Sequence, residues 1–93
     1  MTDAEFRAAL TKMSAWVAAY REKAGALPVL SRVAPGDVEK ALPSIAPAHG
    51  EPVEAWIRDL EEIILPGITH WNHPGFMAYF GITGSAPGIL GEL

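Results

Sequence analysis

Two histidines, His70 and His73, stand three residues apart and are candidates for metal chemistry, because imidazole nitrogens bind zinc. A zinc site needs three or four ligands, and the chain has only one further histidine, His49, and no cysteine. Pro74 follows His73 directly and disfavours the regular helix that would align the two rings. We therefore predict hydrogen-bonded structural histidines, with metal binding as the weaker alternative.

The glycine-rich stretch 81–88 resembles a phosphate-binding loop in its glycine content alone. It lacks the Gly-Lys-Ser/Thr ending that supplies charge and a metal contact. Ser85 and Pro87 instead predict the start of a helix at Ala86. The N-terminus of that helix could hold an anion, although an ordinary helix start needs no ligand.

No residue is evidently placed for covalent catalysis. There is no cysteine, and none of the four serines lies in a nucleophile-elbow pattern. A Schiff-base lysine works by being buried and losing its charge easily, whereas Lys12, Lys23 and Lys40 all have polar helical surroundings. The carboxylates at 59, 61 and 62 belong to the polar side of a predicted helix. On residues alone, a small helical binding or dimerisation module is the best interpretation.

The most unusual stretch, 68–87, combines aromatic side chains with glycines and prolines and follows neither the helical nor the strand period. Aromatic residues need packing, and Gly and Pro specify tight backbone turns. The combination predicts a rigid loop that presents aromatic side chains to a ligand or partner.

Two amphipathic helices are predicted to position this loop. The first covers residues 3–24, since Thr2 and Glu5 have capping-box spacing and Gly25 suits a left-handed helix end. Its apolar stripe repeats in steps of three and four and comprises Phe6, Leu10, Met13, Val17 and Tyr20, widened by Trp16.

The second helix is predicted from Glu51-Pro52 until Pro66-Gly67 stops it. Between the two helices, prolines mark extended linkers around a short helix near 38–42. The predicted fold is therefore all-α: two main amphipathic helices, a short helix and extended linkers, ending in a loop rich in glycine and aromatic residues. We divide the chain into a helical segment, 1–85, and the start of a further helix, 86–93.

Composition restricts the function classes. A net charge of −4 argues against nucleic acid as a partner, and no apolar run approaches the roughly 20 residues of a membrane span. The acidic start shows no secretion signal, so we expect a cytoplasmic protein. A mean hydropathy of +0.16 is high for 93 residues, because so short a chain buries only about 60–65% of its surface. We therefore expect it to be part of a larger assembly.

Several motifs resemble the N-terminal segment of the group II pyridoxal-phosphate decarboxylases, which act on aromatic L-amino acids, tyrosine and tryptophan. The similarity runs in register across all 93 residues and is most specific in Pro66-Gly67-Ile68-Thr69-His70-Trp71, followed by Pro74 and Phe76-Met77-Ala78-Tyr79-Phe80. Further matches are Val33-Ala34-Pro35-Gly36, Leu42-Pro43 and Gly88-Ile89-Leu90.

The resemblance implies a segment of a fold-type I enzyme that uses pyridoxal 5'-phosphate (PLP). The family's Schiff-base lysine, and the groups that contact the cofactor ring, lie further along longer chains and have no counterpart here. We therefore expect PLP in the full-length enzyme and none on this chain alone. The family's N-terminal segment extends over the second subunit of a homodimer, which makes that subunit and the PLP domain the expected partners.

The resemblance also implies a substrate-binding role for Trp71, Tyr79 and Phe80, which match residues lining the pocket for an aromatic amino acid. Relatives that act on hydroxylated rings have Pro and then Thr after Tyr-Phe, whereas this chain has Gly81, Ile82 and Thr83. We thus place Ile82 and Thr83 in the pocket and expect unsubstituted rings to be accepted. The alternative function is a free-standing helical interaction or dimerisation module without catalysis.

Overall fold

The computed structural model describes residues 1–79 and 84–93, and every regular element within them is helical. Helix α1 spans Asp3–Lys23 and runs into a 3₁₀ turn, Ala24–Ala26. Helix α2 is short, Asp37–Ala41. Helix α3, Val53–Asp59, continues through a π-helical stretch, Leu60–Ile64, into α4, Leu65–Gly67, and α5 covers Ala86–Glu92. The prediction of an all-α chain is confirmed for the described residues.

The start of α1 confirms the predicted capping box. The Glu5 side chain accepts the Thr2 backbone N–H at 2.6 Å, and the Thr2 hydroxyl accepts the Glu5 backbone N–H at 3.3 Å. These hydrogen bonds with Thr2 hold the pKa of Glu5 below its ordinary value. Two otherwise unpaired N–H groups of the first turn are satisfied in this way.

The end of α1 corrects the expectation for Gly25. Among the described residues only Gly36 has a positive φ, 89°, so Gly25 does not close the helix in a left-handed conformation. The helix instead tightens into the 3₁₀ turn, and a Cβ added at Gly25 would lie 3.5 Å from the Pro74 ring. At that distance a Cβ would make an ordinary van der Waals contact, so neither the backbone angle nor the available space requires glycine at this position.

The second helix ends at Pro66-Gly67, as predicted, and Pro66 itself lies inside the last turn. A proline in a helix lacks an N–H donor and its ring crowds the carbonyl four residues earlier, which here is Glu62. The wider π-helical turn at Leu60–Ile64 surrounds that carbonyl. A π-bulge is one of the ways in which a helix accommodates such a disruption.

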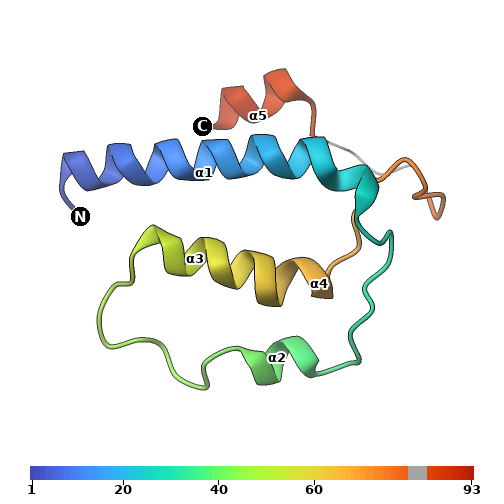
Figure 1. Ribbon diagram of the computed structural model, residues 1–93, viewed down its shortest axis with the longest axis horizontal. Coiled ribbons are helices and arrows are strands. Elements are labelled where there is room, and N and C mark those ends of the chain that lie inside the picture. Colours follow the sequence, from blue (N-terminus) through green and yellow to red (C-terminus); the bar gives the residue numbers. More distant parts are fainter. Residues whose placement is uncertain (80–83) are drawn as a thin grey trace.

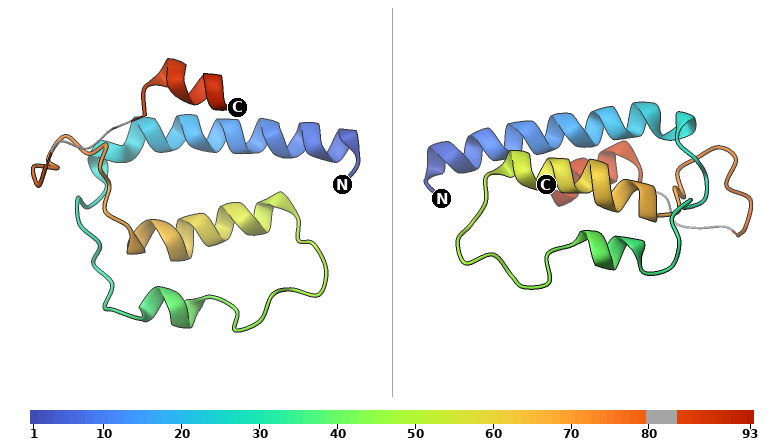
Figure 2. Two further views of the ribbon diagram at one scale, coloured as in Figure 1. Left: turned by 180° about the vertical axis from the view of Figure 1, so that it is seen from behind. Right: turned by 60° about the horizontal axis from the view of Figure 1, so that its bottom comes forward.

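The helices lie in a flat arrangement (Figures 1 and 2). Helices α1 and α3 run side by side in the same direction. The segment that connects them contains α2, which lies on the far side of α3 from α1. Helix α5 lies along the other side of α1. The extents are 43 × 35 × 19 Å, so along its shortest axis the molecule is no more than about two helix diameters thick.

This flat shape leaves almost no hydrophobic core. Ala24 and Ala55 are the only apolar residues classed as buried in the described part of the chain. The accessible surface is 7249 Å², about 2,000 Å² more than the roughly 5,200 Å² expected of a compact 10.0 kDa protein. The radius of gyration, 15.3 Å, likewise exceeds the roughly 12 Å of a compact chain of this length. The helices therefore bury their apolar side chains against one another only in part.

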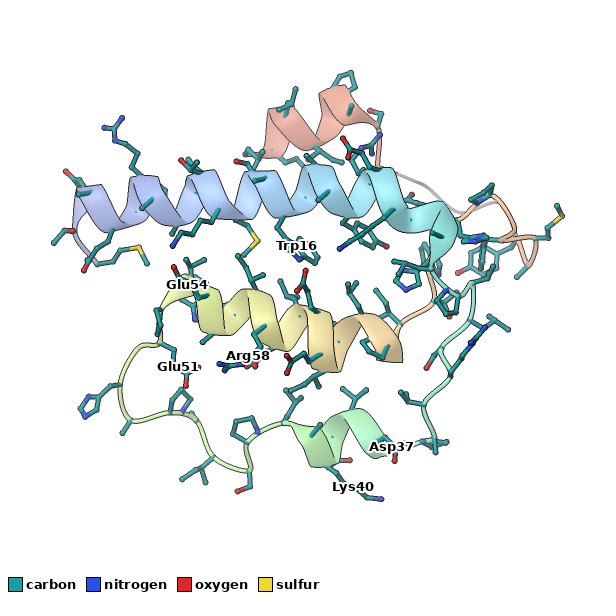
Figure 3. The ribbon with its side chains drawn as sticks, in the orientation of Figure 1. Trp16, Asp37, Lys40, Glu51, Glu54 and Arg58 are labelled. Carbon is teal, nitrogen blue, oxygen red and sulfur yellow. The ribbon has the colours of Figure 1, made fainter. Side chains whose placement is uncertain are left out.

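Polar contacts join α1 to the α3–α4 helix (Figure 3). Lys12 pairs with Glu54, the Trp16 indole N–H donates to Glu61 at 3.2 Å, and Lys23 lies 3.9 Å from the same carboxylate. The N-terminal part of the predicted apolar stripe points elsewhere, because at about 100° per residue Leu10 lies about 160° around the helix from Lys12. Phe6 and Leu10 keep 59% and 41% of their surface exposed.

Gly67 marks the closest approach between α4 and α2. A Cβ added there would lie 2.4 Å from Cγ2 of Val38, a distance that forces one of the two elements to move. We expect Gly67→Ala to destabilise the longer enzyme by about 1–3 kcal/mol, which is the usual cost of overpacking. Differential scanning fluorimetry measures the loss, and Val38→Ala in the same chain should restore most of it. A Gly67→Ala enzyme with an unchanged melting temperature would contradict the close contact.

Candidate functional site

Three aromatic side chains of the segment after α4 form a cluster on the molecular surface. The Trp71 and Tyr79 rings meet edge to face with centroids 5.5 Å apart, and Phe76 and Tyr79 meet in the same way at 5.2 Å. Trp71 and Phe76 lie 6.3 Å apart. Trp71 is 48% exposed and Tyr79 is exposed as well. Two sequence-predicted site residues are therefore brought together, whereas Phe80, Ile82 and Thr83 lie outside the described residues.

Tight turns hold this cluster in place. The backbone N–H of His73 donates to the carbonyl of His70 at 3.0 Å, and that of Phe76 donates to the carbonyl of His73 at 3.0 Å. The Gly75 N–H donates to Nδ1 of His73 at 2.8 Å, and a Cβ at Gly75 would lie only 3.0 Å from that nitrogen. Successive turns with side-chain support give the loop a defined backbone, as the sequence predicts.

His70 anchors the loop to the rest of the molecule. It is only 3% exposed, its backbone N–H donates to the Val29 carbonyl at 3.0 Å, and its Nδ1 lies 2.9 Å from the Tyr20 hydroxyl. Burial raises the pKa of Tyr20, so the phenol keeps its proton and can donate it to Nδ1. In that arrangement the imidazole proton resides on Nε2.

Both histidines are hydrogen-bonded within the chain, as predicted. Within residues 1–79 and 84–93, no three His, Asp or Glu side chains are grouped closely enough to hold a metal ion. At the start of α5, the Ser85 hydroxyl accepts the Gly88 N–H at 3.1 Å. This ordinary N-cap accounts for the Ser85–Gly88 pattern without an anion.

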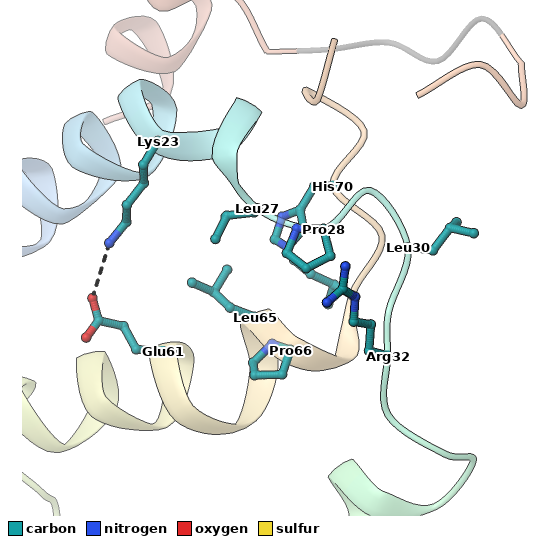
Figure 4. Close-up of a pocket in the computed structure, with 10 residues that line it drawn as sticks. Lys23, Leu27, Pro28, Leu30, Arg32, Glu61, Leu65, Pro66 and His70 are labelled. Carbon is teal, nitrogen blue, oxygen red and sulfur yellow. Dashed lines mark ion pairs between the residues drawn. The ribbon is translucent and has the colours of Figure 1, made fainter. Parts of the chain in front are cut away.

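An open groove lies between the end of α1 and the α3–α4 helix (Figure 4). This groove has a volume of about 440 Å³, with Lys23 and Glu61 at one end and Arg32 at the other. His70 lies between these ends, and the remaining walls are apolar: Leu27, Pro28, Leu30, Leu65, Pro66 and Ile68. The ring of His70 thus separates Tyr20 from an open apolar groove.

Comparison with known proteins assigns the chain to a family. The model of the pyridoxal-dependent decarboxylase conserved domain matches residues 35–93. The chain belongs to the pyridoxal-dependent decarboxylases. A phenylacetaldehyde synthase of a Rosa hybrid cultivar is 44% identical over 89 residues, which are 96% of this chain and 18% of that protein. A tryptophan decarboxylase of Camptotheca acuminata is 40% identical over the same shares of the two chains.

Solved structures of the family have the same fold. The 4-hydroxyphenylacetaldehyde synthase of Rhodiola rosea matches with a TM-score of 0.90 and 38% identity, covering 99% of this chain and 20% of that one. The Catharanthus roseus tryptophan decarboxylase in complex with L-tryptophan matches with a TM-score of 0.88 and 37% identity over the same shares. The chain thus spans about a fifth of the length of these relatives, and its resemblance to a group II decarboxylase segment is confirmed.

The three lysines of this decarboxylase segment all reach solvent. Lys12 pairs with Glu54 and Lys23 lies near Glu61, each with about half of its side chain exposed, and Lys40 is exposed on α2. A Schiff-base lysine, in contrast, works in a desolvated pocket.

Sequence reasoning missed the part that Tyr20 takes in the site. It placed Tyr20 on the apolar stripe of the first helix, where the ring does stack on Trp16 with centroids 5.7 Å apart. The one available signal was the phenol itself, since a buried tyrosine hydroxyl usually has a hydrogen-bond partner. Nothing in the sequence indicates that the partner is fifty residues away in the loop.

Proposed function

We propose that this chain is the N-terminal part of a PLP-dependent enzyme that decarboxylates aromatic L-amino acids. In it the aromatic cluster lines the substrate pocket, with Trp71 and Tyr79 contributing ring faces and edges. The observation that carries the proposal is that these rings are exposed on a loop whose backbone is fixed by His70 and His73. Rigid, partly exposed aromatic groups are suited to binding another aromatic ring.

The comparisons support the substrate class. Relatives include proteins named tryptophan decarboxylase and tyrosine decarboxylase, and one solved relative holds L-tryptophan. From the sequence we add Phe80, Ile82 and Thr83 to the proposed pocket. We also keep the division into a segment 1–85, which supplies the loop and dimer contacts, and residues 86–93, which lead toward the PLP domain.

The proposed division of labour follows from the residues present. PLP, held by the remainder of the enzyme, supplies the electron sink for loss of the carboxyl group. The present chain supplies binding and orientation of the side chain of the amino acid. In this proposal the chain moves no proton: Nδ1 of His70 and Nδ1 of His73 are both engaged in hydrogen bonds within the chain, and Tyr79 is assigned to ring contact.

We further propose that the exposed apolar surface is covered in a homodimer. The surplus of about 2,000 Å² on one chain exceeds the roughly 800 Å² per partner that a standard complex buries and lies in the range of obligate dimers. The exposed Phe6 and Leu10 belong to this surface.

The test of the function is a substrate comparison with the full-length enzyme loaded with PLP. We expect kcat/KM for tryptophan, phenylalanine and tyrosine to exceed that for leucine or glutamate by at least about 100-fold, or about 2.7 kcal/mol. Carbon dioxide release measures turnover whether the organic product is an amine or an aldehyde. A preference for aliphatic or acidic substrates would overturn the proposed pocket. If the 93-residue chain occurs naturally as a separate protein without activity, the free-standing module is the correct function.

Discrimination among aromatic rings tests the proposed place of Ile82. An aliphatic side chain cannot pair with a ring hydroxyl, which is left unsatisfied at a cost of about 1–3 kcal/mol. Phenylalanine and tryptophan should thus be used at least as well as dihydroxyphenylalanine. Ile82→Thr should shift the preference toward the hydroxylated ring by about tenfold. A wild-type preference of more than about tenfold for that ring would assign the hydroxyl contact to Thr83 instead.

A further inference from the structure

A continuous series of contacts connects the α3–α4 helix with the aromatic loop by way of α1. The Glu61 carboxylate accepts the Trp16 indole N–H, and the Trp16 ring stacks on Tyr20 with an interplanar angle of 4°. The Tyr20 hydroxyl then meets Nδ1 of His70 at 2.9 Å. Trp71 is the next residue of the chain after His70. One face of α1 therefore leads directly to the proposed substrate-binding ring.

The His70 ring is only 3% exposed, and Tyr20 is its one hydrogen-bond partner among the described residues. Its backbone is held on both sides, since its N–H donates to the Val29 carbonyl and its carbonyl accepts the His73 N–H. On its other side the ring borders the apolar groove, which offers space of about 440 Å³ into which it could turn. The Tyr20 hydroxyl is thus what selects one orientation of a nearly buried ring.

We propose that Tyr20 is a positioning residue for substrate binding, acting through His70 to set where Trp71 lies against the aromatic ring of the substrate. This inference rests on the proposed pocket and goes beyond it, because Tyr20 lies on α1 and is not part of the aromatic cluster. Without the hydroxyl, Nδ1 of His70 loses its partner inside a buried site, and the ring rotates to recover one. Trp71 shifts with it.

The kinetic consequence is specific. Trp71 contacts the side chain of the substrate and not the reacting carboxyl group, so its displacement weakens ground-state and transition-state binding alike. Such a change raises KM and leaves kcat unchanged. A general loss of folding would instead lower the concentration of active enzyme and the affinity for the cofactor.

The experiment compares Tyr20→Phe, His70→Leu and the double variant in the full-length PLP-loaded enzyme. We expect Tyr20→Phe to raise KM for tryptophan about 5- to 20-fold, with kcat and PLP affinity within about twofold of wild type. His70→Leu should have a similar effect. The KM of the double variant should be no higher than that of the single variant with the higher KM, because the double variant removes both polar partners together. Ser14→Ala removes a hydroxyl that bonds only within α1, to Thr11, and serves as the matched control with unchanged KM.

A second measurement does not depend on activity. In enzyme labelled with fluorotryptophan, the ¹⁹F resonance of Trp71, assigned with Trp71→Phe, should shift in Tyr20→Phe and not in Ser14→Ala. An unchanged KM together with an unchanged Trp71 resonance would refute the positioning role, and so would additive effects in the double variant. A wild-type enzyme that is inactive on aromatic amino acids would refute the proposed function alone, and the resonance would still decide whether Tyr20 positions Trp71.

Discussion

Replacing Phe6 and Leu10 together with aspartate should convert the proposed dimer into monomers. The two side chains are 59% and 41% exposed and lie on a part of α1 turned away from α3. In a dimer that covers these two positions, each new carboxylate is buried without a partner. An uncompensated buried charge costs about 3–5 kcal/mol. We expect the dissociation constant of the dimer to rise at least about 1,000-fold.

Analytical ultracentrifugation across a range of protein concentrations measures this change. The control is Ala15→Asp, which adds one negative charge to the same helix at an exposed position about 180° around from Phe6. The control should sediment as wild type. A double variant that stays dimeric at nanomolar concentration would show that the stripe packs on the enzyme's own PLP domain. Loss of the dimer in both variants would mean that charge anywhere on α1 disturbs assembly.

The features that sequence alone predicts correctly are those set by neighbouring residues. The capping box needs only Thr2 and Glu5, three positions apart, and the structure forms both of its hydrogen bonds. The start of the second helix after Pro52 and of α5 after Ser85 follow from equally short signals. Such contacts form within one helical turn and depend little on the rest of the fold.

The features that sequence does not predict are those set by distant residues. Gly25 was expected to close α1 in a left-handed conformation, but the helix instead tightens into the 3₁₀ turn Ala24–Ala26. The pairing of Tyr20 with His70 joins residues fifty positions apart, and neither residue type specifies the other. This pairing is a tertiary contact that no local pattern encodes.

The candidate site divides along the same line. The sequence indicates that the loop is rigid and aromatic, since Gly, Pro and ring residues alternate in it, and the structure brings Trp71 and Tyr79 into edge-to-face contact. Phe76 was part of the motif but not of the predicted site, and its ring joins both. This contact depends on the turns at His73 and Gly75, which bring the Phe76 ring against the rings of Trp71 and Tyr79, eight residues apart in the sequence.

Trp71→Ala should cause the largest loss of substrate use among changes in the loop. The indole offers the widest ring face of the cluster, and about half of its surface is open to a ligand. Truncation removes its contact with the substrate ring and also the edge-to-face support of Tyr79, each aromatic pair being worth about 0.5–1.5 kcal/mol beyond the area it buries. We expect kcat/KM for tryptophan to fall about 100-fold, or about 2.7 kcal/mol.

The loss should appear mainly in KM, and Trp71→Phe should retain most of the activity because a smaller ring still offers a face. The matched control is Trp56→Ala, which removes the same residue type from α3, where its exposed fraction of 44% is close to that of Trp71. Trp56 lies outside the aromatic cluster, so its removal can change stability but should leave KM for tryptophan within about twofold of wild type. Equal increases in KM from the two truncations would place the substrate ring elsewhere. A fall in kcat alone for Trp71→Ala would show that the indole contacts the reacting end of the substrate. Only the loss of an interaction made in the transition state lowers kcat without raising KM.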